Sequence, residues 1–136
     1  MPLINEGRPL AHFIGIGGIG ISALARWFLA QKWAVSGSDM TRSPIIRELQ
    51  KEGVKVKIGH KSVNLSPKTS LGVYSSAVPR TNPELKRARN LGIKFLSYPE
   101  AVGKIAEIYT TIAIGGSHGK STTTAILGLI LRKAKF

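Results

Sequence analysis

Apolar and polar residues alternate in blocks along the first part of the chain. Residues 11–16 (AHFIGI) form a short apolar block, which predicts a buried strand. Residues 33–37 predict a second strand that ends near Asp39. Between them, residues 19–32 carry apolar side chains at helical spacing, which predicts a helix with one buried face, formed by Ile21, Leu24, Ala25 and Phe28.

Capping residues mark the helices that follow. Ser43-Pro44 predicts a helix start, with Ser as N-cap and Pro at the first position, and this helix runs to about residue 51 and stops at Gly53. Residues 82–84 (Asn-Pro-Glu) start another helix, which ends at Gly92. The remaining pattern predicts strands at residues 54–57, 71–75 and 93–96, and a short helix at residues 99–105.

Strands that alternate with helices predict a parallel sheet covered by helices on both faces. Residues 1–108 are therefore expected to form a Rossmann-like α/β domain. The pattern then restarts with a strand at residues 110–114, a glycine-rich turn at 115–120 and a helix at 121–133. This order opens a P-loop ATPase domain, so we expect residues 109–136 to be the truncated start of a second nucleotide-binding domain.

Composition adds a strongly basic charge to this picture. The 136 residues include 20 Lys and Arg against 7 Asp and Glu, a net charge of +13. Such a balance favours an anionic partner, whether a phosphorylated metabolite, nucleic acid or a membrane surface. The absence of cysteine excludes a disulfide framework and a thiolate metal site. The uncharged residues 13–25 are too few to span a bilayer and too rich in glycine for a signal peptide.

Gly15, Gly17 and Gly20 form a G-x-G-x-x-G motif between the first predicted strand and its helix. In this position the motif lets the backbone approach a pyrophosphate, whose charge is stabilised at the helix N-terminus. Asp39 follows Gly20 by 19 residues, at the end of the second strand, where a carboxylate can accept a hydrogen bond from a ribose hydroxyl. These residues thus favour a nucleotide site, which could be that of an NAD-binding module. The alternative is that the glycines serve only turns and packing.

Residues 116–122 (GSHGKST) form a second glycine loop that resembles a P-loop. A strict Walker A motif has glycine five residues before Gly119, where this chain has Ile114, so the match is to a shorter G-x-x-G-K-[ST] form. In such a loop backbone N–H groups surround phosphates, Lys120 neutralises β- and γ-phosphate oxygens, and the Ser121 hydroxyl ligates Mg²⁺.

The three histidines carry weaker signals. His60 follows a predicted strand, where a loop cap and a ligand contact are both open interpretations. His118 lies inside the second glycine loop, where a side chain commonly braces the loop, and His12 is expected to be structural. The sequence offers no cluster of His, Asp and Glu at metal-ligand spacing.

The two phosphate loops lie about 100 residues apart. Together with several shorter motifs they resemble the Mur ligases, and most closely those members that join L-alanine to UDP-N-acetylmuramate. The resemblance runs from residue 12 to about residue 130 in the family's order and spacing. Its segments are residues 12–22 (HFIGIGGIGIS), 35–39 (VSGSD), 59–60 (GH), 74–78 (YSSAV), 82–84 (NPE) and 116–124 (GSHGKSTTT).

The resemblance implies a three-domain, ATP-dependent ligase of peptidoglycan synthesis. Its reaction activates the muramoyl carboxylate as an acyl phosphate, which the amine of L-alanine then attacks. Residues 1–108 would be the UDP-N-acetylmuramate-binding domain and residues 109–136 the start of the central ATP-binding domain. We expect this chain to bind the UDP-sugar without turnover, and the parent enzyme to be cytoplasmic, to use ATP and Mg²⁺, and to need no nucleic acid or membrane partner.

The same resemblance assigns candidate site residues. Those expected to bind the UDP-sugar are Gly15, Gly17, Gly18, Ile19, Gly20, Asp39, His60, Ser75, Ser76 and Ala77. Arg80 is added from its position just beyond residues 74–78, where it could meet a phosphate or the lactyl carboxylate. Those expected to bind ATP are Gly116, Ser117, His118, Gly119, Lys120, Ser121 and Thr122, with Lys120 catalytic and Ser121 a ligand of Mg²⁺. The chain departs from the family pattern at Ser117 and Ser121, where threonine is usual, and at Tyr98, where arginine is common.

Three other functions remain open at this point. A related Mur ligase that recycles murein peptides uses the same sugar nucleotide. A dinucleotide-binding module of the NAD(P) type is compatible with the first loop. The net charge of +13 suggests nucleic-acid binding, but the sequence has no zinc finger, aromatic RNA-binding signature or clear helix-turn-helix.

Overall fold

The computed structural model describes residues 7–136. The chain divides into two compact units, one that extends to Lys104 and one that begins at Ile105. Each unit is described separately below.

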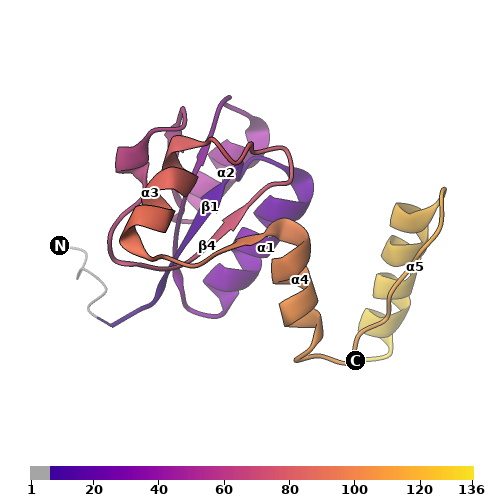
Figure 1. Ribbon diagram of the computed structural model, residues 1–136. Coiled ribbons are helices and arrows are strands. Elements are labelled where there is room, and N and C mark those ends of the chain that lie inside the picture. The colour runs from indigo at the N-terminus through magenta and orange to yellow at the C-terminus, as the bar shows by residue number, and fades with distance from the viewer. Residues whose placement is uncertain (1–6) are drawn as a thin grey trace. The chain divides into compact units, whose positions relative to one another are not determined.

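The first unit is built on five parallel strands (Figure 1). Across the sheet they follow the order β3-β2-β1-β4-β5, so β1 lies at the centre. The strands are β1 (Leu10–Ile14), β2 (Ala34–Asp39), β3 (Lys55–Ile58), β4 (Thr69–Tyr74) and β5 (Phe95–Ser97). The predicted parallel sheet with flanking helices is confirmed, with strand ends that differ from the sequence-based bounds by one or two residues.

The helices between the strands cover both faces of the sheet. They are α1 (Ile19–Ala30), α2 (Pro44–Lys51), the 3₁₀ helix η1 (Ser62–Asn64) and α3 (Pro83–Leu91). Helix α4 (Tyr98–Ala106) follows the last strand, β5. Helices α1 and α2 contact each other, and α3 contacts η1. Because parallel crossovers are right-handed, the reversal of strand order at β1 and β4 places these two pairs on opposite faces. The sequence pattern did not predict η1.

Side chains fix the starts of three helices. The Ser43 hydroxyl accepts a hydrogen bond from the backbone N–H of Ile46, as its position before α2 predicted. Asn82 caps α3 in the same way, through Glu84 N–H at 2.8 Å. In the first turn of α4, the Glu100 carboxylate accepts hydrogen bonds from the backbone N–H and the hydroxyl of Ser97, the residue before the helix, and these bonds lower the pKa of Glu100.

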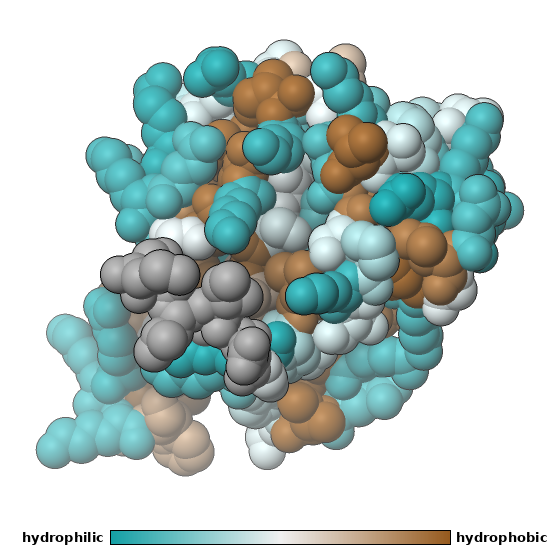
Figure 2. Space-filling view, turned by 90° about the vertical axis from the view of Figure 1, so that its left-hand side faces the viewer, coloured by the Kyte–Doolittle hydropathy of each residue, from teal (hydrophilic) through white to brown (hydrophobic). Residues whose placement is uncertain are grey.

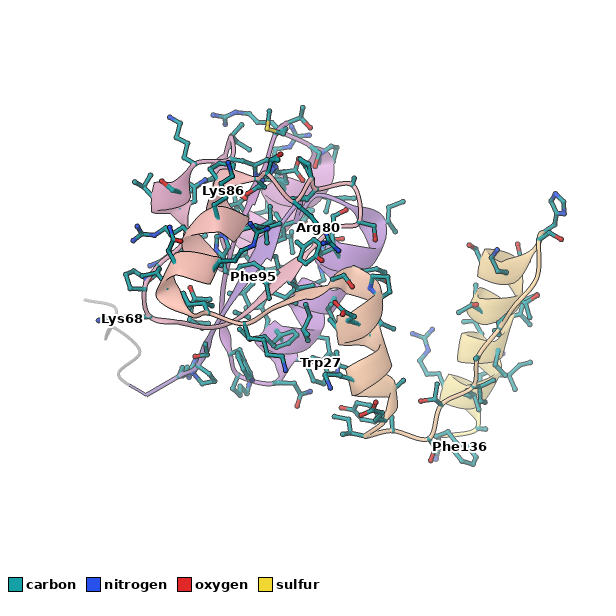
Figure 3. The ribbon with its side chains drawn as sticks, in the orientation of Figure 1. Trp27, Lys68, Arg80, Lys86, Phe95 and Phe136 are labelled. Atoms are coloured by element: carbon teal, nitrogen blue, oxygen red, sulfur yellow. The ribbon has the colours of Figure 1, made fainter. Side chains whose placement is uncertain are left out.

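Apolar side chains of β1 and α1 form the centre of the core. Phe13 and Phe28 are buried, and their rings meet edge-to-face with centroids 5.5 Å apart. Trp27 and Trp33 also pack edge-to-face against Phe28. On β4, Gly72 leaves room for the ring of Phe95 from β5, which occupies the space that a Cβ would take (Figure 3).

The second unit contains α5 (Lys120–Lys133), which starts one residue before the predicted helix. The prediction of a strand at residues 110–114 is wrong, because these residues carry no strand structure. A strand is stable when a neighbour satisfies its backbone hydrogen bonds, and residues 105–136 contain no second strand to pair with it. Across residues 7–136, no helix is both long enough and apolar enough to span a membrane.

The surface carries much of the net charge. Hydrophilic residues cover most of the face shown in Figure 2, with separate apolar patches between them. The edge strand β3 contributes Lys55 and Lys57, both exposed. Charged side chains on an edge strand disfavour pairing with another chain, so these two lysines serve solubility as well as charge.

Candidate functional site

A cleft of about 570 Å³ lies at the carboxyl ends of β1, β2 and β4. In parallel α/β sheets, ligands bind in the crevice where the strand order reverses, which here is between β1 and β4. The cleft is also within the usual size range of small-molecule sites. Six residues predicted to bind the UDP-sugar line it, namely Gly15, Gly18, Asp39, His60, Ser75 and Ala77.

Gly15 joins β1 to the first glycine loop. Its φ of +78° lies in the left-handed region that glycine adopts readily. A Cβ at this position would also lie 2.9 Å from the Cβ of Ser75, at the end of β4. Hydrogen bonds from the backbone N–H groups of Gly15 and Ile16 to the Ser38 carbonyl tie the loop to β2. Glycine is therefore required here by both backbone geometry and space.

Asp39 supports the loop from the end of β2. Its Oδ2 accepts a hydrogen bond from the Gly17 backbone N–H at 2.8 Å, and its Oδ1 lies 3.3 Å from the Thr41 N–H. The sequence suggested a ribose contact for Asp39 and did not reveal this brace. Each carboxylate oxygen has two lone pairs, so Asp39 can hold the loop and still accept a hydrogen bond from a ligand in the cleft.

Helix α1 points its N-terminus at this loop. Gly18 is its N-cap residue, no side chain caps the helix, and its first turn contains no acidic residue. The N–H groups of a first turn have no partner within the helix, and the helix dipole adds partial positive charge there. This terminus therefore has the features of an anion-binding site. Ile19, its first residue, is 84% exposed.

The third motif glycine lies against the first residue of α4. A Cβ at Gly20 would lie 2.5 Å from the Tyr98 hydroxyl oxygen and 2.7 Å from the ring carbon that bears it. Gly20 therefore allows Tyr98 at the start of α4 to approach α1. With Gly17, Ile19, Ser76 and Arg80, Gly20 belongs to the predicted site residues that do not line the cleft.

The segment between β4 and α3 forms the far wall of the cleft. Six lining residues were not predicted from the sequence, namely Met40, Val78, Pro79, Thr81, Asn82 and Pro83. The signal that could have found most of them is the Asn82-Pro83 helix start, because a helix that begins after a central strand faces the same sheet edge. Arg80 lies on this segment and is exposed, and its carbonyl accepts a hydrogen bond from Arg89 (Figure 3).

A buried polar network lies behind the cleft wall. Glu84 is fully buried, and its Oε2 accepts a hydrogen bond from His12 Nε2 at 2.7 Å. Its Oε1 lies 3.0 Å from Asn64 Nδ2 and 3.3 Å from His60 Nδ1. His60 Nδ1 is also 3.0 Å from the Ser38 hydroxyl oxygen. His12 is structural, as expected, whereas the sequence gave no sign that Glu84 turns inward.

The network keeps Glu84 ionised. Burial by itself raises the pKa of Glu84, but hydrogen bonds from His12, Asn64 and Ser38, together with the charge of His12, outweigh that effect. The pKa of this carboxyl therefore lies below its ordinary value of 4.5. A charged group at this depth is tolerated because each carboxylate oxygen faces a donor.

The second glycine loop is exposed. Gly119 is the N-cap residue of α5 with a φ of +75°, no side chain caps the helix, and its first turn has no acidic residue. Lys120 folds back so that its Nζ donates to the Gly116 carbonyl at 2.6 Å. Ser117, His118, Ser121 and Thr122 are all exposed.

These features of residues 116–122 fit a triphosphate and its metal ion. The N–H groups at the start of α5 face no side-chain acceptor, a lysine lies within reach of the loop, and the Ser121 hydroxyl is open to solvent. Within the described residues no group of three or more His, Asp and Glu side chains could hold a metal ion. A magnesium ion here would depend on the Ser121 hydroxyl and on phosphate oxygens.

Comparison with protein families identifies residues 10–110 as a match to the model of the Mur ligase family, catalytic domain. A UDP-N-acetylmuramate–L-alanine ligase of Campylobacter jejuni (strain 81116) is 52% identical over 123 residues. A ligase of the same name from Carboxydothermus hydrogenoformans is 42% identical over 125 residues. These alignments cover 90% and 92% of the chain but only 28% and 27% of the relatives. The chain thus spans little more than a quarter of the length of these proteins.

Solved structures give the same result for the fold. The UDP-N-acetylmuramate–alanine ligase MurC of Thermotoga maritima matches 92% of the chain with a TM-score of 0.86 and 29% identity. A murein peptide ligase of Psychrobacter arcticus matches 93% with a TM-score of 0.85 and 29% identity. The chain covers 29% and 27% of these two proteins.

Proposed function

The chain belongs to the Mur ligase family, and we propose that its first unit binds UDP-N-acetylmuramate in the cleft at the ends of β1, β2 and β4. The parent protein is then an ATP-dependent UDP-N-acetylmuramate–L-alanine ligase of peptidoglycan synthesis. The observation that carries this proposal is the uncapped, acid-free N-terminus of α1 beside the cleft, in a chain 52% identical to a ligase of that name.

The cleft suggests a role for each part of the ligand. The glycine loop and the first turn of α1 would hold the pyrophosphate. Asp39 and His60 would lie toward the uridine, since both line the cleft. Ser75, Ser76 and Ala77 would contact the sugar end, and Arg80 is exposed and close enough along the chain to meet a phosphate or the lactyl carboxylate.

The second glycine loop is proposed to bind ATP and Mg²⁺ in the complete enzyme. Residues 116–122 would surround the phosphates, and the Ser121 hydroxyl would hold the metal ion. Bound ATP would supply the phosphoryl group that activates the muramoyl carboxylate as an acyl phosphate. Lys120 is the proposed catalytic residue, because its ammonium can leave Gly116 and stabilise charge on the transferring group.

This chain by itself is proposed to bind the UDP-sugar without turnover. It covers 28% of its Campylobacter relative, so the alanine site and the rest of the ATP site would lie in the remaining part of such a protein. We place the enzyme in the cytoplasm, with no nucleic acid or membrane partner. The basic charge is then explained in part by the pyrophosphate, the carboxylate and ATP as ligands.

A murein peptide ligase is the second candidate function. The structural match to such a protein from Psychrobacter arcticus, with a TM-score of 0.85, is almost equal to the match to MurC. The sequence relatives at 42–52% identity favour the alanine ligase.

Calorimetric titration of the chain with UDP-N-acetylmuramate and, separately, with NADH tests the proposal. We expect the UDP-sugar to bind and NADH to bind weakly or not at all. The Lys120→Ala variant serves as a matched control, and its affinity for the UDP-sugar should equal that of the unsubstituted chain. Binding of NADH alone would identify a dinucleotide module instead. DNA binding that the UDP-sugar fails to displace would support the nucleic-acid interpretation.

A further inference from the structure

Glu84 is the second residue of α3, where an acidic side chain would ordinarily stay exposed near the helix N-terminus. Here Asn82 caps the helix, and the carboxylate of Glu84 turns inward, where it is fully buried. Capping thus gives no reason for its burial. Its contacts instead reach His60, which lines the cleft.

The ionised Glu84 carboxylate determines which atoms of its neighbours carry a hydrogen. An ionised carboxylate only accepts hydrogen bonds, so each group that faces it must donate. Asn64 Nδ2 is a donor in any state, whereas the ring nitrogens of His12 and His60 donate only when protonated. The Ser38 hydroxyl lies 3.0 Å from His60 Nδ1 and can either donate or accept, so it is compatible with a hydrogen on that atom. The ionised Glu84 carboxylate, 3.3 Å from His60 Nδ1, therefore favours a hydrogen on that atom.

A neutral histidine that carries its hydrogen on Nδ1 has a lone pair on Nε2. The Nδ1 edge of His60 faces the buried network, while the side chain lines the cleft and is 13% exposed. We propose that Glu84 is a positioning residue for the ligand: it fixes His60 with Nδ1 protonated, so that Nε2 accepts a hydrogen bond from a donor in the cleft.

This inference rests on the proposed function and adds to it. The nucleoside of a UDP-sugar offers two kinds of donor, the imide N–H of the uracil ring and the hydroxyls of the ribose. The opposite tautomer, with hydrogen on Nε2, would meet these groups as a donor and would lose the match to the imide N–H. The buried carboxylate thus acts on ligand choice through the ring it holds.

Nitrogen NMR of the chain with labelled histidine tests the tautomer directly. At neutral pH we expect the hydrogen of the His60 ring on Nδ1 and not on Nε2. The Ser38→Ala variant keeps Glu84 and should leave this tautomer unchanged. A His60 ring that carries its hydrogen on Nε2 in the unsubstituted chain overturns the inference.

The Glu84→Gln variant tests the link to binding. The glutamine amide can donate to His60 Nδ1, so the ring becomes able to move its hydrogen to Nε2. We expect that shift in the spectrum and an affinity for UDP about tenfold lower, the loss that roughly one hydrogen bond accounts for. Glu52→Gln, on an exposed carboxylate paired with Arg26, should change neither quantity.

The result that overturns the link is a folded Glu84→Gln chain with unchanged UDP affinity. If Glu84→Gln does not fold, the spectra of the unsubstituted and Ser38→Ala chains decide the tautomer. N3-methyl-UDP, 2′-deoxy-UDP and 3′-deoxy-UDP identify the donor, and equal affinity for all three and for UDP contradicts the hydrogen bond to Nε2. An unsubstituted chain that binds no UDP contradicts the proposed function, whereas UDP binding with His60 protonated on Nε2 contradicts only the role of Glu84.

Discussion

Replacing His12 by leucine should destabilise the first unit strongly. His12 is 1% exposed and Glu84 is fully buried, with 2.7 Å between His12 Nε2 and Glu84 Oε2. Removal of one partner from such a pair typically costs 3–5 kcal/mol, because the other charge stays buried. We expect the lower end, about 3 kcal/mol, because Asn64 and His60 still face Oε1.

An exposed ion pair of the same unit provides the control. Arg26 and Glu52 are 39% and 37% exposed and lie 2.9 Å apart. An exposed pair contributes only about 0.2–1 kcal/mol, so Arg26→Leu should have a small effect. A loss of about 3 kcal/mol is a large share of the 5–15 kcal/mol typical of a small domain, so the two variants should be easy to tell apart.

Urea unfolding followed by tryptophan fluorescence measures the effect. The chain has two tryptophans, Trp27 and Trp33, and both lie in the first unit, so the signal reports on that unit alone. A double-mutant cycle of His12→Leu with Glu84→Met should give a coupling energy above about 1 kcal/mol, since the double variant buries no charge. The reasoning is refuted if His12→Leu costs no more than Arg26→Leu, or if the coupling is near zero.

The lowered pKa of Glu84 makes the stability of the first unit depend on pH. The stabilisation by the ionised carboxylate is fully present above the ordinary pKa of 4.5 and is lost as pH falls through the lower pKa of the folded state. The free energy of unfolding should therefore drop less between pH 5 and pH 3 in Glu84→Gln, and parallel curves would contradict this. Gly17→Ala places a Cβ 2.8 Å from the Asp39 carboxylate and should weaken UDP binding about tenfold in calorimetry. Gly103→Ala meets no atom within 4 Å and should leave binding intact, so a similar loss in both would argue against a local effect. Gly72→Ala collides with the Phe95 ring and should cost roughly 1–3 kcal/mol in urea unfolding, less in a Phe95→Leu background; equal costs would show that the ring is not the obstacle.

The order of elements could be predicted from the sequence because it depends on local signals. Apolar blocks indicated the strands, and Ser43 and Asn82 marked the starts of α2 and α3 before any contact was known. The strand expected at residues 110–114 failed for the opposite reason. Its pattern was adequate, but a strand also needs a neighbour, and its unit contains none.

The glycine loop was recognisable from the sequence, whereas the neighbours of its glycines were not. The spacing of Gly15, Gly17 and Gly20 predicted a phosphate loop at the start of α1. Only the fold brings Ser75 against Gly15 and Tyr98 against Gly20, because these contacts join residues far apart in the chain. No local pattern records such distances.

The sequence alone determined the alternation of strands and helices, the two phosphate loops and the family resemblance, because each of these is written in neighbouring residues. The tertiary structure decided which side chains meet. It turned Glu84 from a helix-start acid into a buried partner of His12 and His60, and it assigned Asp39 to the Gly17 backbone. These pairings follow from the strand order β3-β2-β1-β4-β5, which places the ends of β1, β2 and β4 side by side and which no single segment encodes.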